Sequence, residues 1–121
     1  MKYYYNGKLI RTSKNHIYTH AVIDITTMKV IGCRGSLEKA EALLTSEINY
    51  VIRGNENAKN KLECFRAGKK RYGWKEGRNT WYETFKPTDT EEKLLRCVKN
   101  GEEYLETIKQ NYKVVELETE V

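Results

Sequence analysis

The alternation of apolar and polar residues in the first third of the chain is typical of β-strands. The dipeptide Asn6-Gly7 separates two such runs, Lys2 to Tyr5 and Lys8 to Thr12, and it is the strongest short-range signal of a β-hairpin. Further runs follow from His16 to Ile25 and from Met28 to Arg34. The connections between the runs are short, which favours antiparallel neighbours. We therefore expect an N-terminal antiparallel β-meander.

After Ser36 the apolar residues recur every three or four positions, which is the spacing of one face of a helix. The dipeptide Gly54-Asn55 has the residue types that commonly end a helix. The pattern therefore predicts a helix from Ser36 to Arg53 and a second, shorter helix from Asn57 to Ala67. The apolar stripe of the first helix should cover one face of the sheet, and it consists of Leu37, Ala40, Leu44, Ile48, Val51 and Ile52.

The following stretch is expected to be a loop and then a strand. Glycines punctuate the chain from Gly68 to Arg78, which indicates a loop. From Asn79 to Lys86 the residues alternate again, and Pro87 ends the run.

A long helix is expected near the C-terminus. Thr88 and Glu91 match the capping-box pattern that begins a helix. Gly101 leaves the apolar spacing in phase, so one helix is favoured over two, and Val114 to Val121 predicts a final strand. These elements together predict an α+β fold, in which the meander is packed by helices and the long C-terminal helix is followed by a short strand.

Length and composition favour one domain without a membrane span. The chain has 121 residues, so we expect residues 1–121 to form a single ligand-binding domain. It contains no long apolar run and no signal-peptide pattern at its start, so we expect it in the cytoplasm. Its three cysteines are widely spaced, which predicts reduced thiols, and His16 and His20 are too far apart on a strand to share a metal ion. We expect neither a metal nor a cofactor.

The positive charge of the chain is concentrated in one segment. From Arg66 to Arg78 there are six basic residues and one acidic residue, a balance equal to the net charge of +5 of the whole chain. Such a patch suits an anionic partner, such as a nucleic acid or a nucleotide. A solvated basic loop without a partner is the alternative.

The motifs favour binding over catalysis. The sequence has no nucleophile elbow, zinc-protease motif or phosphate-binding Walker loop, so we do not expect an enzyme. Aromatic residues lie among the basic ones, and their rings can stack on a nucleotide base. Tyr82 is one such candidate, as are Trp81 and Phe85, although the pattern favours the last two as core residues on the buried face of a strand.

A second candidate site lies where the fourth strand meets the first helix. Gly32 and Gly35 are close to Arg34, and Ser36 stands at the expected N-cap. A cation beside the N-terminus of a helix is a plausible anion site. The structural alternative is that the glycines only allow a turn and that Ser36 only caps the helix.

The N-terminal run from Tyr3 to Lys14 (YYYNGKLIRTSK), the run from Tyr18 to Val22 (YTHAV) and the segment Cys33-Arg34-Gly35-Ser36 resemble a known family. The family is that of the small phage anti-Thoeris proteins that act as signal sponges. The resemblance implies a protein that sequesters cyclic ADP-ribose isomers made by bacterial TIR-domain proteins, without cleaving them. It also implies a homo-oligomer, a dimer or a hexamer, with pockets between subunits, in which some members bind cyclic oligonucleotides at separate sites.

The chemistry of such a ligand selects seven candidate residues. Phosphates would meet the basic or hydroxyl side chains of Arg34, Ser36 and Arg78, and adenine would stack on Trp81, Tyr82 or Phe85. Arg11, from the N-terminal run, is the seventh. One alternative is a nucleic-acid-binding or anti-CRISPR phage protein acting through the patch from Arg66 to Arg78, and another is a protein inhibitor with aromatic contacts near Trp74 and Trp81.

Overall fold

The computed structural model describes residues 1–76 and 79–120, apart from the side chains of residues 74–76 and 79–81. The fold is α+β, as predicted: antiparallel strands come first, and the long second helix is followed by short strands. Contacts within the chain separate it into two compact units, one formed by Met1–Asn49 with Thr107–Val121 and the other by Tyr50–Glu106. We call them unit 1 and unit 2. The single ligand-binding domain stays a prediction.

Unit 1 begins with two β-hairpins. The first joins β1 (Lys2–Tyr5) to β2 (Lys8–Thr12), as predicted. Asn6 and Gly7 both have positive φ, at 49° and 77°, which is the conformation of the type I′ turn that matches the twist of paired strands. The second hairpin joins β3 (His20–Asp24) to β4 (Val30–Arg34).

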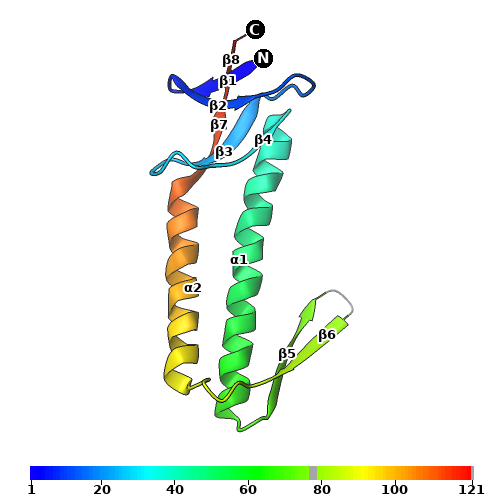
Figure 1. Ribbon diagram of the computed structural model, residues 1–121, viewed down its shortest axis with the longest axis vertical. Helices are drawn as coiled ribbons and strands as arrows, with labels where there is room; N and C mark the ends of the chain where they lie inside the picture. The colour runs from blue at the N-terminus through cyan, green and yellow to red at the C-terminus, as the bar shows by residue number, and fades with distance from the viewer. Residues whose placement is uncertain (77–78, 121) are drawn as a thin grey trace. The chain divides into compact units, whose positions relative to one another are not determined.

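The C-terminal strands complete two separate sheets from these hairpins. β7 (Tyr112–Glu116) pairs with β3, and β8 (Glu118–Glu120) pairs with β1. The strand orders are therefore β4-β3-β7 and β2-β1-β8 (Figure 1). The predicted meander is thus divided in two, because each hairpin takes its third strand from the end of the chain and not from its neighbour.

The tyrosine hydroxyl of Tyr3 explains why the third strand starts later than predicted. The predicted strand began at His16, whereas β3 begins at His20. Tyr3 is fully buried, donates a hydrogen bond to the carbonyl of His16 at 2.9 Å and accepts one from the N–H of Tyr18 at 3.2 Å. The backbone of residues 16–18 is therefore held by the Tyr3 side chain and not by hydrogen bonds to a neighbouring strand. The core around Tyr3 also contains Ala21, Ile23, Cys33 and Leu117.

Helix α1 (Leu37–Arg66) is one continuous helix of 30 residues, so the predicted stop at Gly54-Asn55 is wrong. Gly54 does not have a positive φ, and the amide of Asn55 donates a hydrogen bond to the carbonyl of Gly101 at 3.0 Å. The packing that holds Asn55 against the second helix outweighs the weak local preference of glycine to end a helix.

The stop at Gly68 is confirmed. Gly68 has a φ of 72°, its N–H donates to the carbonyl of Phe65, and the N–H of Lys69 donates to that of Cys64, each at 3.0 Å. These two bonds form a Schellman motif, which satisfies the last carbonyls of a helix.

Helix α2 (Glu91–Asn111) is unbroken at Gly101, as predicted, but it starts later than the Thr88 capping box suggested. Its cap is Thr90, whose Oγ1 accepts a hydrogen bond from the N–H of Lys93 at 3.2 Å. Thr88 and Thr90 are both possible caps. The capping-box pattern requires a glutamate three residues after the cap and therefore selected Thr88, which is wrong. Gly101 has a packing role, since a Cβ there would collide with the side chain of Asn55.

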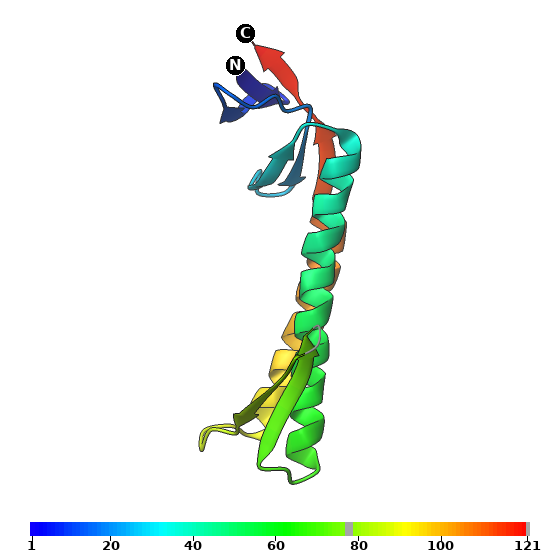
Figure 2. The ribbon, with the colours of Figure 1, turned by 90° about the vertical axis from the view of Figure 1, so that its right-hand side faces the viewer.

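The predicted loop after Gly68 is largely a strand. β5 (Arg71–Glu76) pairs with β6 (Asn79–Thr84) in a two-stranded ribbon, which lies beside the C-terminal part of α1 in both views (Figures 1 and 2). The glycines in this segment indicated a loop. They obscured the extended conformation that allows Arg71–Glu76 to pair with β6. The apolar cluster of unit 2 lies between the helices and the end of the ribbon, and consists of Leu62, Leu94 and Val98 with Ala58, Phe65, Phe85 and Leu95 around them.

No helix in the part of the chain that the structure describes is both long enough and apolar enough to cross a membrane.

Candidate functional site

The junction between β4 and α1 has the predicted helix cap. The Oγ of Ser36 accepts a hydrogen bond from the N–H of Lys39 at 3.2 Å, and its carbonyl accepts one from the N–H of Ala40 at 3.1 Å. Both bonds are internal to the helix start. The hydroxyl is therefore occupied by capping, and the N–H groups that remain for an anion are those of the first two helical residues.

The glycines at this junction provide space and not an unusual turn, because neither has a positive φ. A Cβ on Gly32 would lie 2.8 Å from Cδ2 of Leu43 and 3.2 Å from Nη1 of Arg34. A Cβ on Gly35 would lie 3.1 Å from the carbonyl oxygen of Ile17. Gly32 thus lets α1 and the guanidinium of Arg34 approach the strand closely.

Arg34 is half-buried at the edge of an open depression. Its Nη1 donates a hydrogen bond to the carbonyl of Cys33 at 2.7 Å, which fixes the guanidinium over its own strand. The depression has a volume of about 300 Å³ and is lined by Arg34, Lys39, Ala42, Leu43 and Ser46. Two cations beside a helix start give this hollow the charge that a phosphate group requires.

Arg11 lies near the same strand. Its guanidinium is 5.7 Å from the ring centroid of Tyr18, and that ring also stacks on His16. Burial raises the pKa of the Cys33 thiol, and the positive charges of Arg11 and Arg34 oppose this rise. Arg11, Arg34 and Ser36, all predicted from sequence, belong to unit 1.

The aromatic candidates belong to unit 2 and differ from one another. Tyr82 on β6 is 64% exposed. Phe85 is half-buried in the apolar cluster, with ring centroids 5.4 Å from Phe65 and 4.8 Å from Tyr72. The structure therefore favours the core interpretation of Phe85. Arg78 and the side chain of Trp81 lie outside the described residues, as does the side chain of Trp74.

The basic segment is not uniform. Arg66 pairs with Glu91 at 2.7 Å, and Lys61, just outside the segment, lies 3.8 Å from a carboxylate oxygen of Asp89 and over the ring of Tyr72. Lys69, Lys70 and Arg71 are exposed, and none of the three forms an ion pair with any side chain in the described ranges. The charge available to a partner is therefore at the turn between α1 and β5.

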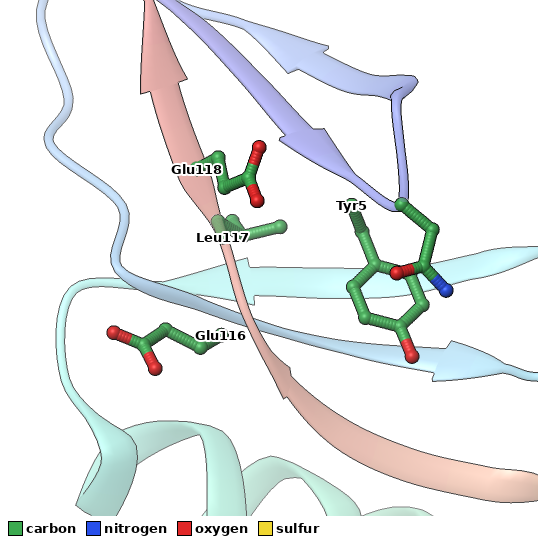
Figure 3. A pocket seen from close by; sticks show the side chains of 5 residues that line it. Tyr5, Glu116, Leu117 and Glu118 are labelled. Carbon is green, nitrogen blue, oxygen red and sulfur yellow. The ribbon is translucent and has the colours of Figure 1, made fainter.

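A second hollow in unit 1 was not predicted from the sequence. It has a volume of about 390 Å³ and is lined by Tyr5, Asn6, Glu116, Leu117 and Glu118. Figure 3 shows the Tyr5 ring on one side and Leu117 with Glu118 on the other, while the carboxylate of Glu116 points away from Tyr5. The alternating glutamates near the C-terminus were the sequence signal for this hollow. The hollow could not be predicted from them, because it forms only when the C-terminal strand pairs with β1 at the other end of the chain. The acidic rim does not suit a phosphate.

Among the described residues, no group of three or more histidine, cysteine, aspartate or glutamate side chains could hold a metal ion.

Comparison with protein-family models, curated proteins and solved structures finds no match for this chain.

Proposed function

We propose that this protein binds a small anionic nucleotide signal and sequesters it without cleaving it. The proposed ligand class is that of the cyclic ADP-ribose isomers, as in the phage anti-Thoeris family that the N-terminal sequence resembles. In this proposal a phage produces the protein in the cytoplasm of its bacterial host, where removal of the signal keeps the Thoeris effector inactive.

The observation that carries the proposal is the open depression at the start of α1, which Arg34 and Lys39 line with positive charge. Arg34 lies there beside the Ser36 cap, and Arg11 belongs to the same unit. Guanidinium groups bind the oxygens of phosphate through paired hydrogen bonds, and a pyrophosphate carries two such groups. Lys39 is the second cation that lines the depression.

The openness of the depression supports a further part of the proposal, which is assembly. A volume of about 300 Å³ open to solvent leaves much of a dinucleotide-sized ligand uncovered. A sequestering protein needs slow release, which requires that the ligand be enclosed. We therefore include a homo-oligomer in the proposal, with a second copy covering the ligand.

Recovery of intact ligand tests sequestration. The protein is incubated with cyclic ADP-ribose isomers, separated from free ligand by filtration and then heat-denatured, and the released compound is identified by mass spectrometry. Recovery of the unchanged isomer is expected. Release of a cleaved product would contradict binding without catalysis, and recovery of nothing would contradict binding of this class.

Substitution of Arg34 tests the site. Arg34→Ala should weaken binding about 10- to 100-fold, because it removes charge-assisted hydrogen bonds worth about 1.5–3 kcal/mol. The matched control is Lys113→Ala, which removes an exposed cation from β7 in the same unit. Calorimetry with both variants measures the effect, and equal affinity in Arg34→Ala and Lys113→Ala would place the ligand elsewhere.

A further inference from the structure

One face of the ribbon of β5 and β6 carries the basic residue Arg71 and the exposed aromatic residue Tyr82. We propose that this face binds single-stranded nucleic acid, with Tyr82 stacking on a base and Lys69, Arg71 and Lys86 contacting phosphates. The site lies wholly in unit 2, so it is independent of the function proposed for unit 1.

The pairing register places the relevant residues on one face. Arg71 is opposite Thr84, and Gly73 is opposite Tyr82. Residues opposite each other in an antiparallel pair point to the same side, and alternate residues along a strand share a face. Tyr82 therefore stands on the same face as Arg71, across from a residue without a side chain. The Tyr82 side chain is 64% exposed.

The other face of the ribbon is anchored to the protein. Tyr72, which is opposite Glu83, is buried, and its ring lies against Phe85 and under the ammonium group of Lys61. Its hydroxyl donates a hydrogen bond to Glu83 at 2.7 Å, so the glutamate side chain is held on the anchored side. The amide of Asn60 on α1 also donates to the carbonyl of Gly73.

These contacts have two consequences for the open face. The backbone under Tyr82 is fixed, so little order has to be gained when a base stacks on the ring. The nearest acidic side chain of the ribbon is directed away from the basic residues, so it does not repel a phosphate.

The backbone pairing continues past the strands toward two further basic residues. The N–H of Phe85 donates to the carbonyl of Lys70 at 3.3 Å, which extends the register toward Lys69 and Lys86. Lys69, Arg71 and Lys86 are exposed and form no ion pair with the side chains that the structure describes. Arg66 does not belong to this set, because Glu91 neutralises it.

Single strands fit this face better than a duplex. Stacking on Tyr82 requires the flat side of a base, which is covered in a duplex and accessible in a single strand. Every base has such a face, so we expect little sequence preference.

The experiment measures fluorescence anisotropy of labelled oligothymidylate, oligouridylate and a DNA duplex with the full-length protein over a range of salt concentrations. Both single strands should bind more tightly than the duplex, and the two arms show whether the sugar matters. Tyr82→Ala should weaken single-strand binding about 5- to 100-fold with the salt dependence unchanged, because stacking involves no phosphate. Tyr82→Phe should retain most of the affinity.

Charge variants separate the phosphate contacts from the stack. Lys69→Ala and Arg71→Ala should each reduce the slope of log affinity against log salt by about 0.7. Matched controls on α2 are Tyr104→Ala, which removes a tyrosine that is 52% exposed, and Lys99→Ala, which removes an exposed cation. The proposal is overturned if neither single strand binds at low salt, if the duplex binds as tightly, or if Tyr82→Ala has no more effect than Tyr104→Ala.

Discussion

Unit 1 and unit 2 hold their elements together in different ways. In unit 1 each sheet is completed by a strand from the end of the chain, and Tyr3, Ala21, Val22 and Ile23 are 0% exposed. In unit 2 the ribbon pairs only with itself, and its most buried apolar residues keep 5–8% of their surface exposed. Every ion pair recorded among the described residues joins side chains of unit 2.

Unit 1 is thus held together by fully buried side chains and by pairing between strands far apart in the sequence. Unit 2 is held together by contacts between helices and by ion pairs on its surface. Exposed ion pairs contribute about 0–1 kcal/mol each, far less than a fully buried aromatic ring. Unit 1 should therefore carry most of the stability.

The largest expected effect comes from Tyr3. Tyr3→Ala should lower the free energy of unfolding by about 3–5 kcal/mol, because it empties a fully buried ring site. Tyr3→Phe keeps the ring but leaves the N–H of Tyr18 and the carbonyl of His16 without the hydroxyl, and it should cost about 1–3 kcal/mol. Urea unfolding measures both.

The counterpart in unit 2 is Phe85, which is half-buried in the apolar cluster. Phe85→Ala should cost less than Tyr3→Ala because less apolar surface is lost. A larger loss for Phe85→Ala would reverse the comparison between the units.

A smaller effect distinguishes two glycines of unit 2 that both lie inside helices. A Cβ on Gly54 meets nothing within 4 Å, so Gly54→Ala should stabilise the protein by about 0.5–1 kcal/mol through helix propensity. A Cβ on Gly101 collides with Asn55, so Gly101→Ala should lose the Asn55 hydrogen bond and destabilise the protein by about 1 kcal/mol.

The double variant Asn55→Ala with Gly101→Ala tests this explanation. It should recover part of the loss, because the colliding side chain is gone and alanine favours the helix. Thermal unfolding of the single and double variants measures the coupling. Additive losses would mean that Gly101 does not act through Asn55.

These glycines also show how far local sequence could predict the fold. The turn at Asn6-Gly7, the stop at Gly68 and the unbroken helix through Gly101 follow from local preference and spacing, and all three were predicted. The stop at Gly54 failed because a contact with a residue 46 positions away holds the helix together. The pairing of β1 with β8 has the same origin, since no local signal joins the two ends of a chain.

The candidate site follows the same rule. The Ser36 cap was predictable from its position before a helical stripe, and the depression that Arg34 shares with Lys39 and Leu43 was not, because it depends on how α1 packs after the strand. For Phe85 the sequence left two interpretations, a ring that stacks on a base and a core residue, and its packing against the apolar cluster of unit 2 favours the second. Alternation gives the face of a strand, and only the packing shows which face is covered.

The smallest expected effect concerns acid and the turn between β3 and β4 in unit 1. The carboxylate of Asp24 accepts hydrogen bonds from Oγ1 of Thr26 at 2.6 Å and from the N–H groups of Thr26 and Thr27 at 2.9 and 3.3 Å. The Thr26 side chain is the main cause that lowers the pKa of Asp24 below its ordinary value of 3.8, and the backbone bonds add to it. A lowered pKa in the folded state stabilises the fold above the unfolded value, and this contribution is lost as the pH falls through the folded value.

Unfolding free energies measured between about pH 6 and pH 3 should therefore fall slightly more steeply for the unchanged protein than for Asp24→Asn, which cannot titrate at this position. Thr26→Ala removes the strongest donor and should give an intermediate slope. An identical slope in all three proteins would mean that the turn does not favour the charged carboxylate. In that case the pairing of strands from the two ends of the chain, and not the charge of this turn, would distinguish unit 1 from the locally paired ribbon of unit 2.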